Sequence, residues 1–553
     1  MKITVLIYIT YTFINFIIIV IFLHVNGSVL QKSETINLLL KADYVKIIMI
    51  GSYVIFYKGA EHMKKFFKKN ISNLILILLI FVFASCSSYK SIKLVNMSTE
   101  ETKTIKVDIQ GELYINDLPK IIGNYYVKGY SYKKNGAYID VDDKIELKND
   151  GKLYYREGIR KDYFNIDSVG YVFIDCDEEI NSRTEYVDAK IRVVGDGEDL
   201  SANAQIRLRG NTTFHLPKKP YKIKFNSKQN LFNMGSDKEW ALLANYFDPT
   251  YMRNFYAYTF SKAIGMEYTC DAKFVEVYLN DEYNGLYLLT ETVKTSKERV
   301  NIEVNDYSKG VPFLLELDMK LVQDDKNYEK KIDKELFLVD NKAYNNKTYP
   351  IGTKYPKTFE ELNDREYEYI KNYIFSTFES VRNGTFEQFL DIENFIDYFL
   401  VQELFMNIDL DYSSVFLYKD IDSKLKFGPI WDFDLSSGNV GYVKKYSFDK
   451  SMADVNGGNY LFTQAMKYDS FHEQFMERFL DLNRDVIPAM IDSIEYNYAF
   501  LSDYAFKDNE KWGVLYEDNW ARPDNLVGIS YLEQVEYFEN FMIMHNQWMI
   551  ENM

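Results

Sequence analysis

Carboxylates gather between Asn407 and Gly438, in the stretch NIDLDYSSVFLYKDIDSKLKFGPIWDFDLSSG. The stretch follows a predicted helix, and its alternation predicts two short strands joined by a turn. A hairpin returns the chain to its start, so the acidic residues at both ends should share one cleft. These are Asp409 or Asp411 at the first end, and Asp432 and Asp434 at the second. Clustered carboxylates repel one another unless a cation lies among them, which favours Mg²⁺ or Mn²⁺ held partly by substrate phosphates.

A second group of side chains is basic and lies earlier in the chain, in RLRGNTT and PKKPYKIKF. Alternation along a strand puts Lys222 and Lys224 on one face. The same rule puts Arg207 and Arg209 on one face. Basic side chains on strands, facing carboxylates from elsewhere in the fold, suit a nucleoside triphosphate and its metal ion. An ordinary solvated strand face is the alternative for the two lysines.

Bulk composition argues against several other classes of function. With 65 Lys and Arg against 81 Asp and Glu, the formal net charge is −16, which disfavours binding to nucleic-acid phosphates. Only three Cys and five His occur, and none has the close spacing of a zinc site. A chain of 553 residues that is 47% hydrophobic predicts two or three globular units.

The first 86 residues carry two hydrophobic signals. Residues 3–23 are long and apolar enough to predict a transmembrane helix. From Met63 the sequence reads MKKFFKKNISNLILILLIFVFASC, a basic start and an apolar run typical of a lipoprotein signal peptide that ends at Cys86, the expected lipidation site. Residues 1–62 then belong either to a membrane anchor or to sequence upstream of the true translation start at Met63. Both alternatives predict that the remaining chain is exported.

The elements that must position the site follow from periodicity. Residues 87–165 alternate as short strands do and predict a small β-rich domain or stalk. Stronger strands follow in YVFIDCD, AKIRVVG, AQIRLRG, YKIKF, FVEVYLN and GLYLLTETV. The segment 251–264 predicts a helix that ends at Gly265, and beyond Phe359 the pattern changes to long helical periods. We therefore expect an α+β fold in which a β-rich lobe precedes a mainly helical lobe, the order found in protein kinases.

Several motifs between residues 166 and 550 occur in the order typical of one family. They are RLRGNTTFHLPKKPYKIKF, WALLANYFDPTYMRNFYAYTFSKAIGM, FVEVYLNDEYNGLYLLTETV, FLLELD, NIDLDYSSVFLYKD and GPIWDFDLSSG. In these motifs the sequence resembles the CotH family of spore-coat-type, secretory atypical protein kinases. The resemblance implies ATP-dependent phosphorylation of protein Ser or Thr outside the cytoplasm, on a divergent two-lobed kinase fold.

The resemblance also implies roles for individual residues. Asp409 matches the catalytic aspartate, which orients the substrate hydroxyl and takes its proton. Asp432 matches the metal-binding aspartate of the WD-x-D motif, and Asp434 would assist the metal. Glu291 matches a recurrent glutamate that would pair with a lysine or contact the nucleotide. The candidates for contacts with the ATP phosphates are Lys222, Lys224, Arg207 and Arg209.

Two positions depart from the protein-kinase pattern. The motif H-R-D-x-x-x-x-N places a metal-binding Asn five residues after the catalytic Asp, where this chain has Ser414, a weaker ligand. The segment Asp432-Phe433-Asp434 resembles D-F-G but lacks the glycine. A catalytically weak pseudokinase, or a scaffold for surface or coat assembly, is therefore the main alternative. A carbohydrate-binding envelope protein is a second alternative, suggested by the β-rich region and the aromatic content.

These observations predict four parts of the chain. They are a hydrophobic extension at residues 1–62, a signal peptide at 63–86, a small β-rich domain at 87–165 and a kinase domain at 166–553. The expected location is the cell envelope, with a membrane anchor and the catalytic domain outside the cytoplasm, or the spore coat. The expected partner is a protein substrate with Ser/Thr-rich segments.

Two smaller alternatives stay open. Cys176 and Cys270 could form one disulfide in an exported protein. Asp409 and Asp411, with Asp420 at the twelfth position, resemble a calcium-binding loop, although the mid-loop glycine and the final glutamate are missing.

Overall fold

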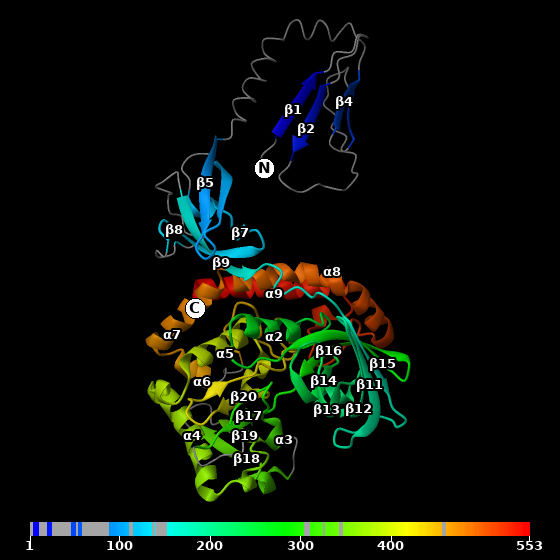
Figure 1. The fold of residues 1–553 in the computed structure, drawn as a ribbon, viewed down its shortest axis with the longest axis vertical. Helices are drawn as coiled ribbons and strands as arrows, with labels where there is room; N and C mark the ends of the chain where they lie inside the picture. The colour runs from blue at the N-terminus through cyan, green and yellow to red at the C-terminus, as the bar shows by residue number, and fades with distance from the viewer. Residues whose placement is uncertain are drawn as a thin grey trace. The chain divides into compact units, whose positions relative to one another are not determined.

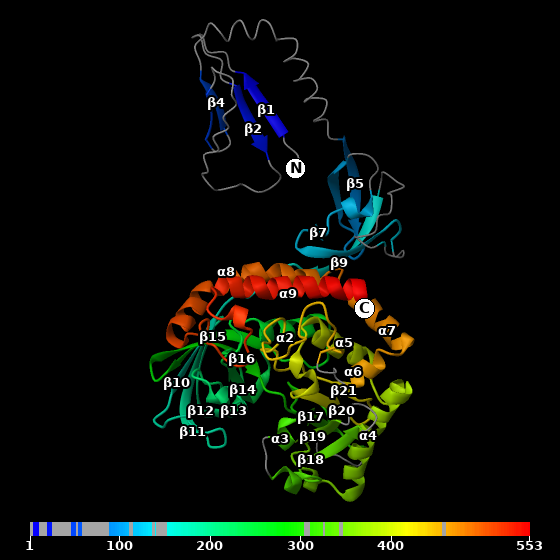
Figure 2. The same ribbon diagram turned by 180° about the vertical axis from the view of Figure 1, so that it is seen from behind.

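The computed structural model describes residues 4–9, 19–24, 46–50, 53–57, 88–109, 114–134, 139, 152–303, 310–323, 327–341, 347–455 and 460–553. The chain divides into two compact units, which Figures 1 and 2 draw from opposite sides. The first unit is Met1–Val95 with Glu100–Leu118 and Asp143–Leu153, and the second is Asn96–Thr99 with Pro119–Asp142 and Tyr154–Met553. Every predicted site residue except Cys86 belongs to the second unit.

The described part of the first unit contains antiparallel strand pairs and the 3-10 turn Ile115–Asp117. The pairs are β1 (Thr4–Ile9) with β2 (Ile19–His24), β3 (Lys46–Ile50) with β4 (Tyr53–Tyr57), and β5 (Ser88–Asn96) with β6 (Thr102–Ile109). The first pair corrects the transmembrane helix predicted over residues 3–23. TVLIYI and IVIFLH are rich in β-branched and aromatic residues, which favour strands. Within the described ranges, no helix is long and apolar enough to span a bilayer.

The other N-terminal predictions are untested. The signal peptide expected at residues 63–86 and the lipidation site Cys86 lie outside the described residues. In the second unit, β7 (Ile121–Ile122) and β9 (Lys152–Arg160) both pair antiparallel with β8 (Tyr125–Ser131). These strands fall within the region predicted to be a small β-rich domain.

Seven strands of the second unit close into a barrel in the order β10-β11-β12-β13-β14-β16-β15. Their bounds are β10 (Gly170–Asp175), β11 (Val187–Gly195), β12 (Glu198–Leu208), β13 (Tyr221–Asn230), β14 (Ser236–Leu243), β15 (Ala272–Leu279) and β16 (Glu282–Glu291). Neighbours are antiparallel except β10 and β15, whose parallel pairing closes the barrel. Ile206 on β12 and Ile223 on β13 are among the buried residues of the apolar interior. The sequence pattern missed only β14 of the seven.

Helices dominate the rest of the second unit. They are α2 (Arg253–Ala263), α3 (Lys320–Gln323), α4 (Asp364–Asn383), α5 (Ile392–Leu404), α6 (Tyr460–Ala465), α7 (Asp469–Leu482), α8 (Val486–Trp512) and α9 (Tyr531–Asn552). Local signals set several ends: Asn363 and Ser530 each form a capping box at a helix start, and Gly384 ends α4 with φ +71°. The long helical periods predicted beyond Phe359 are confirmed.

A second sheet lies among these helices and was not predicted as a whole. Its order is β18 (Leu336–Asn341), β19 (Lys347–Tyr355), β17 (Phe313–Leu317), β20 (Val415–Lys419) and β21 (Lys426–Phe427). The hairpin β20–β21 is the one predicted between the two acidic ends. The part of the fold after the barrel is therefore mixed α and β, and β17 places FLLELD beside β20.

Two of the smaller alternatives are wrong. Strand β20 occupies Val415–Lys419, so the residues from Asp409 to Asp420 form a short turn and a strand instead of a calcium loop. Cys176 and Cys270 are both free. Cys176 follows β10, where its backbone exchanges hydrogen bonds with the Asn280 side chain, whereas Cys270 is buried just before β15.

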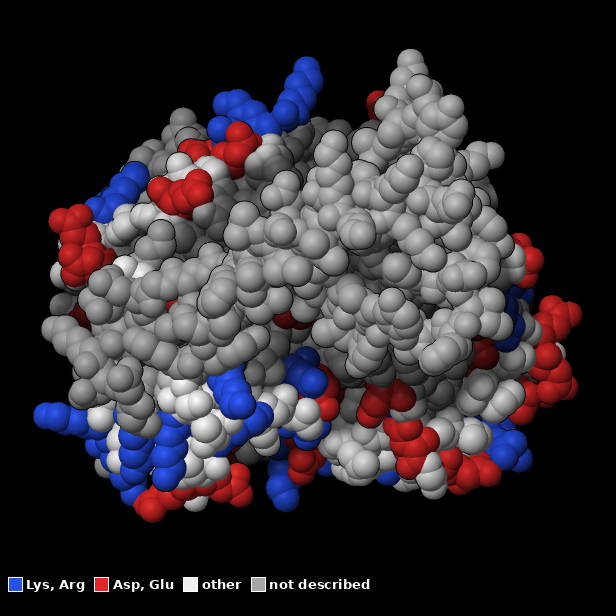
Figure 3. Space-filling model, turned by 90° about the horizontal axis from the view of Figure 1, so that it is seen from above, with Lys and Arg blue, Asp and Glu red and all other residues white. Residues whose placement is uncertain are grey.

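The surface of the described residues carries both signs of charge. Lys and Arg side chains lie next to Asp and Glu side chains on the face drawn in Figure 3. Exposed pairs such as Arg192 with Asp199, 2.8 Å apart, are part of this mixture.

One buried ion pair joins helix α8 to the barrel. The ammonium of Lys218 lies 2.9 Å from the carboxylate of Asp508 on α8, and both side chains are fully buried. The Asp508 carboxylate also accepts hydrogen bonds from the backbone N–H of Leu286 on β16, at 2.7 Å, and from the Tyr251 hydroxyl, at 3.0 Å. Burial lowers the pKa of Lys218, and the charge of Asp508 opposes that effect. The pair therefore fixes α8 against β16.

Asp508→Ala should strongly destabilise the fold, because it leaves the buried ammonium of Lys218 without a counterion. We expect the free energy of unfolding to fall by about 3–5 kcal/mol, measured by denaturant titration. The matched control is Asp199→Ala, which removes the same charge from an exposed pair and should change stability little. Equal effects of the two substitutions would contradict a structural role for the buried pair.

Candidate active site

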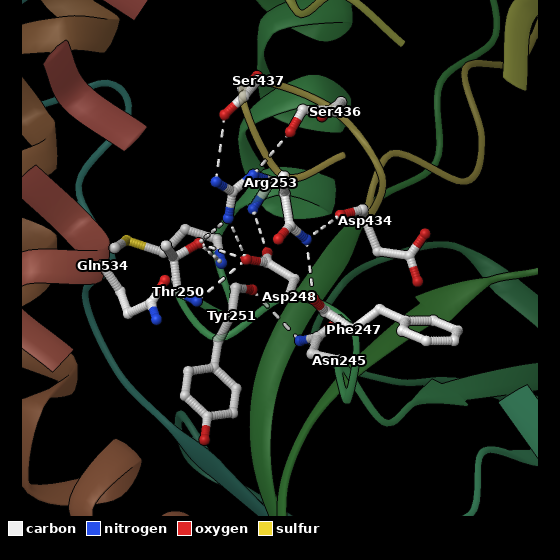
Figure 4. A network of polar contacts seen from close by, with 12 residues as sticks. Asn245, Phe247, Asp248, Thr250, Tyr251, Arg253, Asp434, Ser436, Ser437 and Gln534 are labelled. Carbon is white, nitrogen blue, oxygen red and sulfur yellow. Dashed lines mark hydrogen bonds and ion pairs between the residues drawn. The ribbon is translucent and has the colours of Figure 1, made fainter. Parts of the chain in front are cut away.

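Arg253, the first residue of α2, anchors the loop that carries Asp432 and Asp434. Its guanidinium forms a buried ion pair with Asp248. Its Nε donates to the carbonyl oxygen of Ser436 at 2.9 Å, and Nη2 donates to that of Ser437 at 3.2 Å. Figure 4 shows this fork, with the Asp434 carboxylate pointing away from the guanidinium. A planar guanidinium can hold three acceptors at once, which fixes the direction of the loop.

Two amide side chains hold the same loop from other sides. The Asn254 side chain accepts a hydrogen bond from the backbone N–H of Phe433 at 2.7 Å. Asn439 donates to the carbonyl oxygens of Phe247 and Asp434, each at 2.8 Å. The backbone on both sides of Asp434 is therefore fixed by side chains, while its carboxylate stays available.

The turn after α5 brings Asp409 and Ser414 to this loop. Asn407 accepts a hydrogen bond from the backbone N–H of Asp409 at 3.2 Å and so begins the 3-10 turn Ile408–Asp411. Strand β20 then starts directly after Ser414. The Ser414 hydroxyl donates to Oδ2 of Asp432 at 3.2 Å. The two ends of the predicted hairpin therefore meet through this hydrogen bond.

Both residues in that contact have left-handed backbone conformations. Ser414 has φ +62° and Asp432 has φ +68°. Non-glycine residues adopt such angles infrequently, and such residues concentrate at functional sites.

Burial and neighbouring carboxylates raise the pKa of both Asp409 and Asp434. Burial raises the pKa of Asp409 to about 7, with the charge of Asp432 as the next cause, while Lys320 opposes the shift. Burial, followed by the charges of Asp432 and Asp409, raises the pKa of Asp434 well above its ordinary value. Like charges in a partly dry site disfavour simultaneous ionisation. The cluster would therefore be stabilised by a cation.

Lys320, at the start of α3, is a site residue that the sequence reasoning missed. Burial disfavours its charge, but Asp432, Asp409 and Asp318 outweigh that effect and raise its pKa. The sequence offered one weak signal, which is a lysine two residues after the motif FLLELD. No periodicity linked that motif to Asp409, because the link is made by pairing of β17 with β20.

Four basic residues are predicted to bind phosphate. Among them, Arg209 is the one on whose pKa the charges of the acidic cluster act. Its guanidinium lies 5.1 Å from the ring centroid of Trp431. Burial lowers the pKa of Arg209, while the negative charges of Asp432 and Asp434 oppose that effect. Arg209 directly follows Leu208, the last residue of β12.

The other three basic candidates have partners on the barrel surface. Arg207 donates to the carbonyl oxygens of Arg183 and Leu208. Lys222 forms an ion pair with Glu239 on β14, with an N–O distance of 2.7 Å. Lys224 lies 5.9 Å from the ring centroid of Tyr186. The structure therefore brings Arg209, and not these three, into electrostatic contact with the carboxylates.

Glu291 pairs with an arginine instead of one of the candidate lysines. Its carboxylate forms a buried ion pair with Arg299 and accepts the backbone N–H of Asp271 at 2.9 Å. Burial raises the pKa of Glu291 to about 7, and Arg299 opposes the shift. Buried Cys270 lies close enough for the charges of both Glu291 and Arg209 to act on its thiol.

The oxygen atoms of these side chains suit a hard cation that is also coordinated by a phosphate ligand. Asp432, Asp434 and Ser414 offer oxygen atoms, which Mg²⁺ prefers. Within the described ranges, no three His, Cys, Asp or Glu side chains are grouped closely enough to hold a metal ion by themselves. Mg²⁺ is commonly held by one or two carboxylates together with substrate phosphates, so an incomplete protein shell is consistent with this chemistry.

Carboxylates lie beside a hydroxyl here and cationic side chains lie nearby, an arrangement that could hold a metal-bound phosphate. Residues 206–549 match the family described as CotH kinase protein, and this match covers more than half of the chain. The chain therefore belongs to the CotH kinase family, as the motifs predicted. No curated protein matches the sequence.

Arg253→Lys should loosen the loop that carries Asp432. Lysine keeps the positive charge near Asp248 but lacks the planar fork that holds the carbonyl oxygens of Ser436 and Ser437. We expect amide hydrogen exchange in residues 432–439 to accelerate by about tenfold or more, since hydrogen bonds to charged groups contribute about 1.5–3 kcal/mol each. The measurement is exchange followed by mass spectrometry, with Arg192→Lys as the exposed control. Unchanged exchange would show that the fork does not hold the loop.

Proposed function

We propose that this chain is an ATP-dependent protein Ser/Thr kinase that acts outside the cytoplasm on envelope or spore-coat proteins. Membership of the CotH kinase family supports an atypical kinase-like activity. The observation that carries the finer proposal is the position of Asp409. This carboxyl group, with its pKa raised to about 7, lies within electrostatic reach of Asp432, which accepts the Ser414 hydroxyl.

In the proposed reaction, Asp409 accepts the proton of the substrate Ser or Thr hydroxyl. The hydroxyl oxygen forms a bond to the γ-phosphorus, the bond from that phosphorus to the bridging oxygen breaks, and ADP leaves with the electron pair. A carboxylate with a pKa near the working pH suits this role, because it is ionised before transfer and basic enough to take the proton.

The remaining residues bind and orient the phosphates. Asp432, assisted by Asp434 and Ser414, would hold Mg²⁺ or Mn²⁺, which neutralises negative charge on the phosphates when bound. Arg209 would contact the phosphates from the barrel side, since its guanidinium is the predicted phosphate ligand that interacts with Asp432. Lys222, Lys224 and Arg207 would shape the barrel surface beside the site.

A catalytically weak kinase or a scaffold is the second candidate, and Ser414 is the observation that favours it. A hydroxyl replaces the amide oxygen that the kinase pattern places five residues after the catalytic aspartate. Its hydrogen is donated to Asp432, and its oxygen keeps two lone pairs, but a hydroxyl oxygen is a weaker metal ligand than an amide carbonyl oxygen. Loose metal binding would lower turnover without altering the fold.

The envelope location is proposed on the N-terminal sequence. The segment from Met63 to Cys86 has the form of a lipoprotein signal peptide, and the CotH family is associated with the spore coat and the envelope. The proposed substrates are proteins with Ser/Thr-rich segments that are exposed on the same side of the membrane.

The direct test is transfer of labelled phosphate from ATP to protein. We expect the purified protein with Mg²⁺ or Mn²⁺ to transfer label, and Asp432→Ala and Asp409→Ala each to lose at least about 100-fold of the rate, because each removes a group required in the transition state. Asp199→Ala, at an exposed carboxylate, is the matched control and should retain activity. Nucleotide binding without any transfer by the wild type would favour the pseudokinase instead.

Activity should depend on pH through Asp409. Its pKa is raised to about 7, and the ionised form is the base, so the rate should rise with pH and level off above about 7. At pH 6 we expect a rate about tenfold below the plateau, since one carboxylate in about ten remains ionised there. The measurement is the initial rate of transfer between pH 5.5 and 8.5 at saturating ATP.

Stability provides an independent check on the same group. The folded protein holds the Asp409 proton more tightly than the unfolded chain, so this contribution to stability is present below pH 4 and is lost as pH rises toward 7. Asp409→Asn should therefore show a smaller loss of unfolding free energy over this pH range than the wild type. A flat rate profile together with unchanged pH dependence of stability would exclude Asp409 as the base.

A further inference from the structure

Helix α3 is fixed to the turn that carries Asp409. The backbone N–H of Met319 donates to the carbonyl oxygen of Tyr412 at 2.7 Å. The Tyr412 hydroxyl donates back to Oε1 of Gln323 at 2.7 Å. The backbone N–H of Lys320 donates to Oδ1 of Asp318 at 2.9 Å. The first two bonds attach α3 to Tyr412, three positions after Asp409, and the third fixes the backbone of Lys320 at the start of the helix.

The Lys320 side chain occupies this place as a cation within a group of carboxylates. Its half-buried ammonium lies 5.6 Å from the ring centroid of Tyr412. The negative charges of Asp432, Asp409 and Asp318 act on it and keep it protonated. Within the described residues, however, no carboxylate lies within the 4.0 Å of an ion pair with it. Among these residues the ammonium is therefore held in no single ion pair, while the charges of three carboxylates act on it.

Other cations near the site have committed partners. Lys354 forms an ion pair with Glu316 on β17, with an N–O distance of 2.6 Å. Lys222 is paired with Glu239, as described above. Arg253 pairs with Asp248 and donates to the carbonyl oxygens of Ser436 and Ser437. In the described part of the chain, Arg209 after β12 and Lys320 on α3 are cations on which the charge of Asp432 acts and that form no ion pair there.

We propose that Lys320 is a further catalytic residue, whose ammonium binds the γ-phosphate of ATP beside Asp409. This proposal rests on the function proposed above. As the phosphorus moves to the substrate oxygen, negative charge is spread over its outer oxygens, and a cation already in place stabilises that charge. Lys320 stays protonated throughout, while the substrate proton goes to Asp409 and the electron pair of the broken bond goes to ADP.

The charges of two carboxylates that have different roles in the proposed reaction act on the Lys320 ammonium. It lies within electrostatic reach of Asp432, which would hold the metal, and of Asp409, which would receive the proton. When a γ-phosphate is bound between them, the Lys320 ammonium would donate hydrogen bonds directly to the phosphate oxygens. These bonds would replace its longer-range attraction to the carboxylates. ADP has no γ-phosphate, so Lys320 should contribute to ATP binding and little to ADP binding.

The test compares ATP and ADP affinity of the full chain by calorimetry with Mn²⁺, together with the rate of label transfer. We expect Lys320→Met to weaken ATP binding by about 10- to 100-fold and to leave ADP binding nearly unchanged, as for loss of one charge-assisted phosphate contact. The rate at saturating ATP should fall by about 100-fold or more. Lys320→Arg should retain the preference for ATP.

Controls separate this role from damage to the fold. Lys330→Met removes an exposed lysine ten residues later and should change neither affinity. The unfolding free energy of Lys320→Met should stay close to that of the wild type; if it falls, the Lys320→Gln variant is tested in the same way. Wild-type transfer with an unchanged ATP-to-ADP ratio in the lysine variants would overturn this proposal alone. Absence of ATP binding by the wild type would overturn it together with the proposed function.

Discussion

The buried ion pair between Arg253 and Asp248 is the interaction on which the site depends. It lies where the segment after the barrel strand β14 turns into helix α2, and the same guanidinium holds the backbone after Asp434. A guanidinium buried without a counterion would be very costly, so Asp248 is required for Arg253 to be there at all. Thr250 adds to this arrangement by donating its hydroxyl to Asp248 at 2.6 Å. The loop that carries Asp432 and Asp434 thus takes its position from the charge pair of Arg253 and Asp248.

A second constraint is the repulsion among the buried carboxylates of the site, which disfavours their simultaneous ionisation. Asp409, Asp434 and Asp318 all have raised pKa values, with burial as the first cause in each case. Three like-charged groups remain together because the backbone places them, through the β17–β20 pairing and the loop held by Arg253. The arrangement is costly for stability and useful for binding, since a cation and a phosphate would satisfy both signs of charge.

The sequence predicted the elements with a clear period and missed those without one. Helices α4 and α9 have capping boxes and an amphipathic pattern, and the β20–β21 hairpin follows from its turn. Strand β17 is buried at every residue, so it shows no alternation and reads as an ordinary apolar run. Strand β14 begins with the polar residues SDKE, which do not indicate a strand. The hydrophobic segment at residues 3–23 predicted a helix where strands β1 and β2 lie.

The site residues divide in the same way, into those that a local sequence pattern predicts and those that it does not. Asp409, Ser414, Asp432 and Asp434 lie within one stretch of chain, so a local hairpin was sufficient to predict that they meet. Lys320 and Arg253 reach the cluster through tertiary pairing, which a single sequence does not encode as a pattern. Arg207 and Arg209 have the same residue type and the same strand face, yet β12 ends at Leu208, and only Arg209 lies past that end. Arg209 lies over the Trp431 ring, where the charges of Asp432 and Asp434 act on it, whereas Arg207 donates to the carbonyl oxygens of Arg183 and Leu208.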